Sequence, residues 1–105
     1  MIFGKKISSH DIFERHPGVE WKHIEDSIIL MDKKEGELIR LNEVGAQIWV
    51  EMDGHKPVET IIHELIQYFD APEKKIRKEA MKFIDRLSQM ELITRPKAID
   101  GNQKD

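Results

Sequence analysis

Hydrophobic and polar positions follow two different patterns along this chain. From residue 19 to residue 41 they either alternate or form one short apolar run, as is typical of β-strands. We expect an antiparallel β-meander with tight turns, whose three strands cover 19–24, 27–32 and 37–41. The alternation makes the first strand half-buried, and the apolar middle strand should be buried on both faces.

Beyond Asn42 the apolar positions recur every three or four residues, as in amphipathic helices. This spacing predicts helices over 43–53, 58–69 and 72–90. Asn42 is a suitable N-cap, because its side chain can accept hydrogen bonds from unpaired backbone amides. Gly45 lies inside the first helix, where glycine costs about 1 kcal/mol relative to alanine. We therefore expect another element to approach closely there, and residues 55–57 to form a simple connector.

The length of 105 residues allows a single domain. Residues 1–18 are weakly patterned and end in the turn signal Pro17-Gly18, so we expect an irregular N-terminal arm. Residues 95–105 are polar and should form a disordered tail. The packed domain is therefore expected over 19–94. Its order of elements predicts an α+β fold, winged helix-turn-helix-like, in which a three-stranded antiparallel β-meander is followed by three α-helices.

Composition and charge narrow the function classes. Cysteine is absent, which excludes disulfides, thiolate metal sites and a cysteine nucleophile, and fits a cytoplasmic protein. No apolar run approaches the roughly 18 residues of a membrane span, so no membrane association is expected. The net charge of −3 argues against a general nucleic-acid binder.

The sequence holds no recognisable catalytic or cofactor motif. GxSxG, P-loop and GxGxxG patterns are all missing, so we expect neither enzymatic activity nor a cofactor. The histidines do not predict a metal site. His10 and His16 lie in the weakly patterned arm, and His63 is followed by Gln67 where a zincin helix has its second histidine.

One segment carries a family resemblance. Leu41 to Trp49 (LNEVGAQIW) has a Leu-Asn pair, then a small residue, then an aliphatic–aromatic pair, each separated by two residues. The pattern continues through Asp53-Gly54 and through Phe69 to Pro72 at the start of the third helix. In these residues the chain resembles the PqqD family of pyrroloquinoline quinone biosynthesis and the wider group of RiPP precursor-peptide recognition elements. The resemblance covers about residues 19–94.

The resemblance implies a non-catalytic peptide chaperone. Such proteins bind the leader of a ribosomally synthesised precursor peptide and present it to a modifying enzyme, often a radical SAM protein. In related domains the leader adds an antiparallel strand to the edge of the third strand, in a groove against the third helix. Backbone hydrogen bonds then hold the peptide, and side-chain pockets select it. The same module serves many peptide pathways.

The resemblance also implies where a leader peptide would bind. The candidate peptide-binding residues on the third strand and third helix are Glu37, Leu38, Ile39, Arg40, Leu41, Lys74, Lys78, Ala80, Met81 and Lys82. Ala80 and Met81 are the candidates for the floor and wall of the groove, since methionine adapts to varied partners. We assign Ile76, Phe83 and Leu87 to the core.

A basic stripe runs along the third helix. Residues 72–90 hold six basic and three acidic side chains, which gives +3 and leaves −6 for the rest of a chain whose net charge is −3. The stripe recurs every four residues, at Lys74, Lys78, Lys82 and Arg86. It is either an attractive surface for an acidic peptide or enzyme, or simply a solvated face.

Two further interpretations are open. The helices over 58–69 and 72–90 also fit a winged-helix DNA-binding regulator with the basic stripe on phosphates. Net charge and the lack of a base-reading cluster at the start of the third helix make nucleic acid the weaker partner. An extended arm and an open strand edge also permit a strand-exchanged homodimer.

Overall fold

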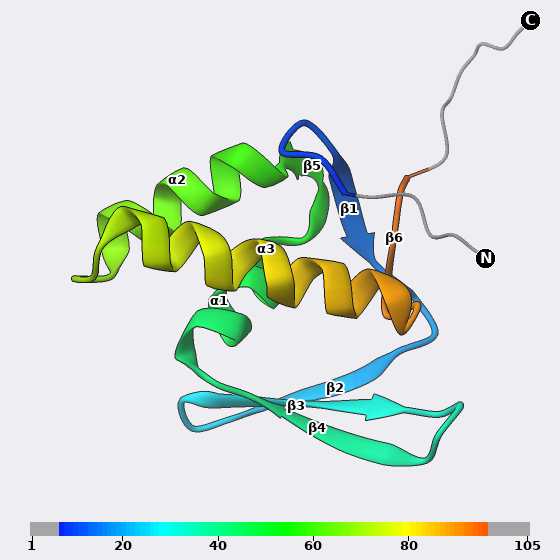
Figure 1. The fold of residues 1–105 in the computed structure, drawn as a ribbon. Helices are drawn as coiled ribbons and strands as arrows, with labels where there is room; N and C mark the ends of the chain where they lie inside the picture. Colours follow the sequence, from blue (N-terminus) through cyan, green and yellow to red (C-terminus); the bar gives the residue numbers. More distant parts are fainter. Residues whose placement is uncertain (1–6, 97–105) are drawn as a thin grey trace, which may run out of the picture.

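The structure is a computed structural model that describes residues 7–96. The meander and the three helices expected from the sequence are present, which confirms the α+β fold class (Figure 1). No helix in the described range is long and apolar enough to span a membrane. The elements, in chain order, are β1 (Ile12–Arg15), β2 (Glu20–Ile24), β3 (Ser27–Asp32), β4 (Glu37–Leu41), α1 (Glu43–Glu51), β5 (Asp53–Pro57), α2 (Val58–Tyr68), α3 (Glu73–Gln89) and β6 (Ile93–Thr94).

The meander has the strand order β2-β3-β4 and packs one face against α1. Its register places Leu30 of β3 between Trp21 of β2 and Ile39 of β4. Leu30 is fully buried, as is Trp49 on the α1 side. In Figure 1, α1 lies between this sheet and α3, and it contacts α2 and α3 as well as β3 and β4. Helix α1 is therefore the centre of the core.

Burial within the meander differs from the expectation. The middle strand is buried on one face only: Ile28 and Leu30 are inaccessible, whereas Met31 is 39% exposed. Strand β2 is present, but all five of its residues are exposed, so the expected half-burial of this strand is wrong. The reason is that the helices cover only one side of the sheet, and β2 is an edge strand.

A second sheet was not expected from the sequence. Its order is β5-β1-β6, and its central strand lies in the segment assigned to an irregular arm. Phe13 of β1 is 1% exposed and belongs to the core, so the packed unit extends well before residue 19. The expected connector over 55–57 is part of β5. These strands have two to five residues and pair with distant segments, so none carries a local signal of its own.

The second sheet is tied to the end of α1 by Arg15. The last turn of α1 holds no basic residue of its own. Nη1 of Arg15 instead donates to the carbonyl oxygens of Trp49, at 3.0 Å, and Val50, at 2.8 Å. The guanidinium also lies over the Trp21 ring, 5.5 Å from its centroid. A cation from a distant strand therefore satisfies the carbonyls at the negative end of this helix.

The described part of the expected tail is also held in place. Arg95 lies over the Phe13 ring and donates to Asp11 at 2.9 Å. The remainder of that expected tail, residues 97–105, lies outside the described residues. Strand β1, which an exchanged dimer would need to release, pairs with β5 and β6 of its own chain.

Candidate functional site

The outer edge of the meander beside α1 is strand β4. Within residues 7–96, β4 pairs with β3 alone. The two-residue turn between Ile24 and Ser27 closes on a hydrogen-bonded pair, which fixes the direction of every backbone group along the sheet. Counting from that pair, Ile39 bonds to β3, whereas the N–H and C=O groups of Leu38 and Arg40 point to the open edge. These groups can accept one further strand.

A groove of about 430 Å³ adjoins the end of this strand. It lies between the first residues of α1 and one face of α3. Its floor and walls combine apolar and charged side chains. The lining residues are Asn42, Val44, Gly45, Glu79, Lys82, Phe83, Asp85, Arg86 and Gln89.

The Leu-Asn segment builds the α1 side of the groove. Leu41 is buried and anchors the end of β4. Asn42 caps α1, with its Oδ1 accepting from the Gly45 amide at 2.8 Å. A Cβ added at Gly45 would lie 3.1 Å from Cζ of Phe83 and 3.3 Å from the Asn42 Oδ1. The close approach expected at Gly45 is therefore confirmed, and the approaching element is α3.

The structure separates the candidate residues of the strand into two sets. Leu38 and Arg40 project to the exposed face, and Leu38 is 67% exposed. Ile39 and Leu41 point to the α1 side, where Ile39 is half-buried and Leu41 is a core residue. Glu37 is exposed and begins the strand. Contact with a peptide would therefore involve the backbone of β4 more than its apolar side chains.

Only one of the candidate residues on α3 lies at the groove. Lys82 lines the groove, whereas Lys74 and Lys78 are exposed and lie outside its lining. Ala80 has no exposed surface and belongs to the core, so it cannot form the floor of an open groove. Met81 is half-buried against the core and does not line the groove either.

The expected position of Phe83 in the core is wrong. We expected it in the core with Ile76 and Leu87, but only those two are buried. Phe83 is half-buried, and its ring forms part of the groove wall opposite Gly45. Val44 and Arg86 also line the groove, although the sequence pattern does not identify them as groove residues. The glycine within α1 was the available signal, because it indicated a tight contact without identifying its partner.

The charges of the groove come from α3. Lys82 and Arg86 stand on its wall together with Glu79 and Asp85. Asp85 Oδ2 accepts from Gln89 Nε2 at 2.9 Å. Half of the basic stripe therefore faces the groove and half faces solvent. The arrangement suits a peptide that carries both apolar and charged side chains.

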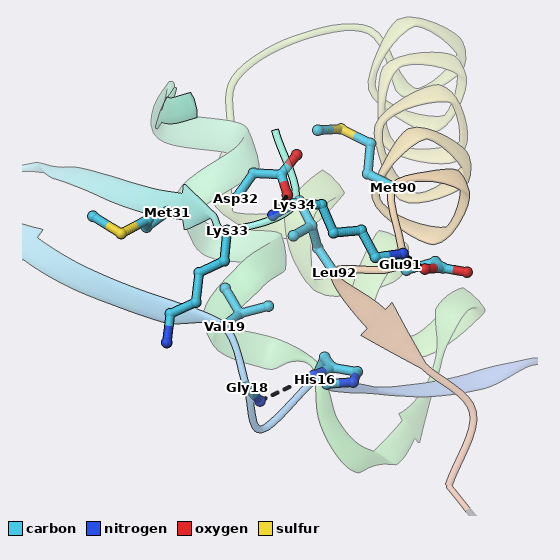
Figure 2. Close-up of a pocket in the computed structure, with 10 residues that line it drawn as sticks. All are labelled: His16, Gly18, Val19, Met31, Asp32, Lys33, Lys34, Met90, Glu91 and Leu92. Carbon is cyan, nitrogen blue, oxygen red and sulfur yellow. Dashed lines mark hydrogen bonds and ion pairs between the residues drawn. The ribbon is translucent and has the colours of Figure 1, made fainter. Parts of the chain in front are cut away.

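A second, smaller hollow of about 150 Å³ lies where β2 and β3 approach the end of α3 (Figure 2). Asp32 is buried at its edge, and its Oδ1 accepts from the Lys34 amide at 3.1 Å. Lys34 also forms an ion pair with Glu91. These charged groups bond to one another and so fix the β3–β4 loop against the end of α3. They do not form a ligand site. Among the described residues, no group of three histidine or acidic side chains is placed to hold a metal ion.

Most of the perturbed pKa values belong to ion pairs between neighbouring elements; the pKa of Asp53 is lowered by the hydrogen bond from the His55 backbone amide. Arg77 donates to both carboxylate oxygens of Glu59, at 2.8 and 3.2 Å. These bonds lower the pKa of Glu59 and raise that of Arg77. Lys56 bonds to Glu51 and Glu64, which raises the pKa of Lys56. Both sets connect neighbouring elements and point to stability rather than to catalysis.

Comparison with known proteins gives one family and one fold neighbour. No curated protein matches the chain. A solved structure described as "TbiB1 in Complex with the TbiA(beta) Leader Peptide" shares its fold, with a TM-score of 0.66 and 22% identity over 76% of this chain and 93% of that one. Residues 27–93 match the family model of coenzyme PQQ synthesis protein D, PqqD. That match spans β3 to the start of β6 and so includes both the open edge and the groove. The chain belongs to the PqqD family.

Proposed function

We propose that this protein is a non-catalytic peptide chaperone that binds the leader of a ribosomally synthesised precursor peptide. The observation that carries the proposal is the open edge of β4 beside the groove between α1 and α3. Membership of the PqqD family supports it. So does the fold neighbour, whose description names a bound leader peptide.

The mode of binding is strand addition. The outward backbone groups of Leu38 and Arg40 bond to an antiparallel peptide strand, and this supplies affinity that does not depend on peptide sequence. Alternate peptide side chains then point toward α1 and enter the groove beside Phe83 and Lys82. This second contact selects the sequence. We expect a dissociation constant in the micromolar range or tighter, equivalent to about −8 kcal/mol or better.

The peptide is carried to an enzyme that modifies it. We propose a radical SAM enzyme as this partner, in keeping with the family resemblance. The chaperone supplies binding and orientation, and the enzyme supplies the chemistry. The cysteine-free sequence suits a reducing compartment, so we place the transfer in the cytoplasm.

Proline substitutions at one strand position test the mode of binding. Leu38→Pro removes an N–H that faces the open edge, and Leu38→Ala is the matched control that keeps it. His23→Pro makes the same change at the opposite edge of the sheet, on β2. The probe is the precursor peptide encoded beside this chain, titrated into the isotope-labelled protein and followed by amide NMR.

The expected result is specific to β4. Leu38→Pro should weaken peptide binding at least tenfold relative to Leu38→Ala, while His23→Pro binds as the wild type does. Amide shifts should be largest in 37–41 and along the groove side of α3. Equal affinities of the folded Leu38→Pro and Leu38→Ala proteins would refute strand addition. A wild-type protein that shows no saturable shifts would refute peptide binding itself.

A further inference from the structure

The meander exposes an apolar surface on the side that faces away from α1. Six large hydrophobic side chains in residues 7–96 are exposed. Three of these lie on that side and line a shallow hollow of about 730 Å³ over β2–β4: Ile24, Met31 and Leu38. Trp21 also borders the hollow, but its pairing with Leu30 and its contact with Trp49 place its ring on the α1 side. The other lining residues are Val19, Glu20, Lys22 and Ile29. A concentration of this kind on one face is characteristic of an interaction site.

The register arranges this surface in rows. Residues that pair across an antiparallel sheet point to the same face, so Met31 lies between Glu20 and Leu38. In the next row, Ile29 lies between Lys22 and Arg40. We call the side chains of these two rows, together with Ile24, the outer face.

The charges of the outer face are predominantly basic. Glu20 is paired with Lys33 at 3.5 Å, which offsets its negative charge. Arg40 bonds to the uncharged Ser27 hydroxyl, and Lys22 has no ion-pair partner in the described part of the chain. The apolar centre is thus flanked on both sides by cations. A partner with an apolar patch bordered by carboxylates would be complementary to it.

A second copy of the chain fits this face poorly. A two-fold contact centred on the row of Lys22, Ile29 and Arg40 brings cations of the two copies together. The area is also small. With a spacing of about 4.8 Å between strands and a rise of about 3.3 Å per residue, three such strands cover roughly 250 Å². A stable protein pair buries about 800 Å² on each partner.

We propose that the outer face docks onto the modifying enzyme, at a surface with an apolar centre and flanking carboxylates. This inference rests on the proposed function and adds the surface through which delivery takes place. A peptide strand bound at β4 would lie beside Leu38 and Arg40, so its outward side chains extend the same face. The enzyme then contacts the carrier and its peptide together, and the small area of the empty carrier favours release after the peptide has gone.

Substitutions on β2 and β3 test this surface without altering the β4 edge. Ile24→Lys and Met31→Lys place charges in its apolar part, and Lys22→Glu reverses a flanking cation. Tyr68→Lys is the matched control, because Tyr68 is 74% exposed on α2, outside the outer face. Binding is measured by calorimetry against the purified peptide-modifying enzyme encoded beside this chain, with and without the precursor peptide. Circular dichroism checks that each variant is folded.

The expected result is at least a tenfold loss of enzyme affinity for the three outer-face variants, with none for Tyr68→Lys. Enzyme affinity of the wild type should rise when the peptide is present, and peptide affinity of all variants should be unchanged.

Wild-type affinity of the folded variants for the enzyme would overturn the inference, as would absence of enzyme binding by the wild type. A wild-type dimer in sedimentation that Ile24→Lys dissociates would also overturn it, because a second copy would then occupy the face. Failure of the proposed function can be distinguished from failure of this inference, because only the peptide titration tests whether the protein binds the peptide.

Discussion

Replacement of Arg15 by methionine should lower the free energy of unfolding by more than substitutions of partly exposed residues usually do. Methionine keeps most of the unbranched stem and removes the guanidinium. The change therefore deletes the two hydrogen bonds to the carbonyls of Trp49 and Val50 and the contact with the Trp21 ring. It leaves the carbonyls of Trp49 and Val50 without this cationic donor, and the last turn of α1 has no basic residue to replace it.

The magnitude follows from these contacts. A hydrogen bond from a charged group contributes about 1.5–3 kcal/mol, and here a single nitrogen serves two acceptors, so we count it once. A cation–π contact at an exposed site adds about 0.5–1 kcal/mol. Water can replace the donor at Val50, where the bond is exposed, which reduces the loss. The free energy of unfolding should therefore fall by about 2–3 kcal/mol.

The assay is urea unfolding followed by tryptophan fluorescence and far-UV circular dichroism. Trp21 and Trp49 pack edge to face with ring centroids 6.0 Å apart, so the fluorescence reports on the altered site. Arg40→Met is the control, because within residues 7–96 the Arg40 side chain bonds only to the Ser27 hydroxyl, at 3.3 and 3.4 Å. This substitution should lower the free energy of unfolding by less than about 0.5 kcal/mol. A loss for Arg15→Met no larger than that of the control would refute the capping role.

Two further changes test other contacts. Arg77 holds the pKa of Glu59 below its ordinary value, so this contribution to stability is present near neutral pH and is lost as the pH falls through the lowered pKa. Glu59→Gln should therefore lower the urea midpoint near pH 7, and its difference from the wild type should shrink as the pH is lowered through the acidic range. In Gly45→Ala, the gain of about 1 kcal/mol in helix propensity offsets the contact with Phe83. Stability should change by less than about 1 kcal/mol, while peptide affinity in the NMR titration falls several-fold because the Phe83 ring moves into the groove; unchanged affinity would contradict its place in the wall.

Elements with a strong local pattern could be predicted from the sequence. The bounds of β3 and β4 are as expected, α2 ends one residue earlier than expected, and α3 is one residue shorter at each end. Alternation over a few residues and apolar stripes at helical spacing are properties of the segment itself. The second sheet could not be predicted in this way, because β6 has two residues and β5 begins Asp53-Gly54-His55 with no alternation. Those strands exist through pairing with β1, which is distant from both in sequence.

The candidate site shows the same division between local and tertiary information. Helical spacing identified the buried side of α3 but not which neighbour covers each part of it. The sequence makes Ala80 a candidate for the groove floor, yet Ala80 lies where α3 is fully covered. The apolar stripe assigns Phe83 to the core, yet Phe83 lies where α3 passes the start of α1 and is only half covered. Residue type alone could not separate these positions.

The family segment and the α3 side of the groove are therefore made of different residues. Leu41 anchors a strand, Asn42 caps a helix and Gly45 leaves room for an aromatic ring, so each has a structural reason to be present whatever peptide is bound. Lys82, Phe83 and Arg86 are among the side chains that line the groove from α3, and they lie outside that segment. A chain with the same Leu-Asn segment and different residues at these three positions should keep the fold and the strand-adding edge and bind a different leader.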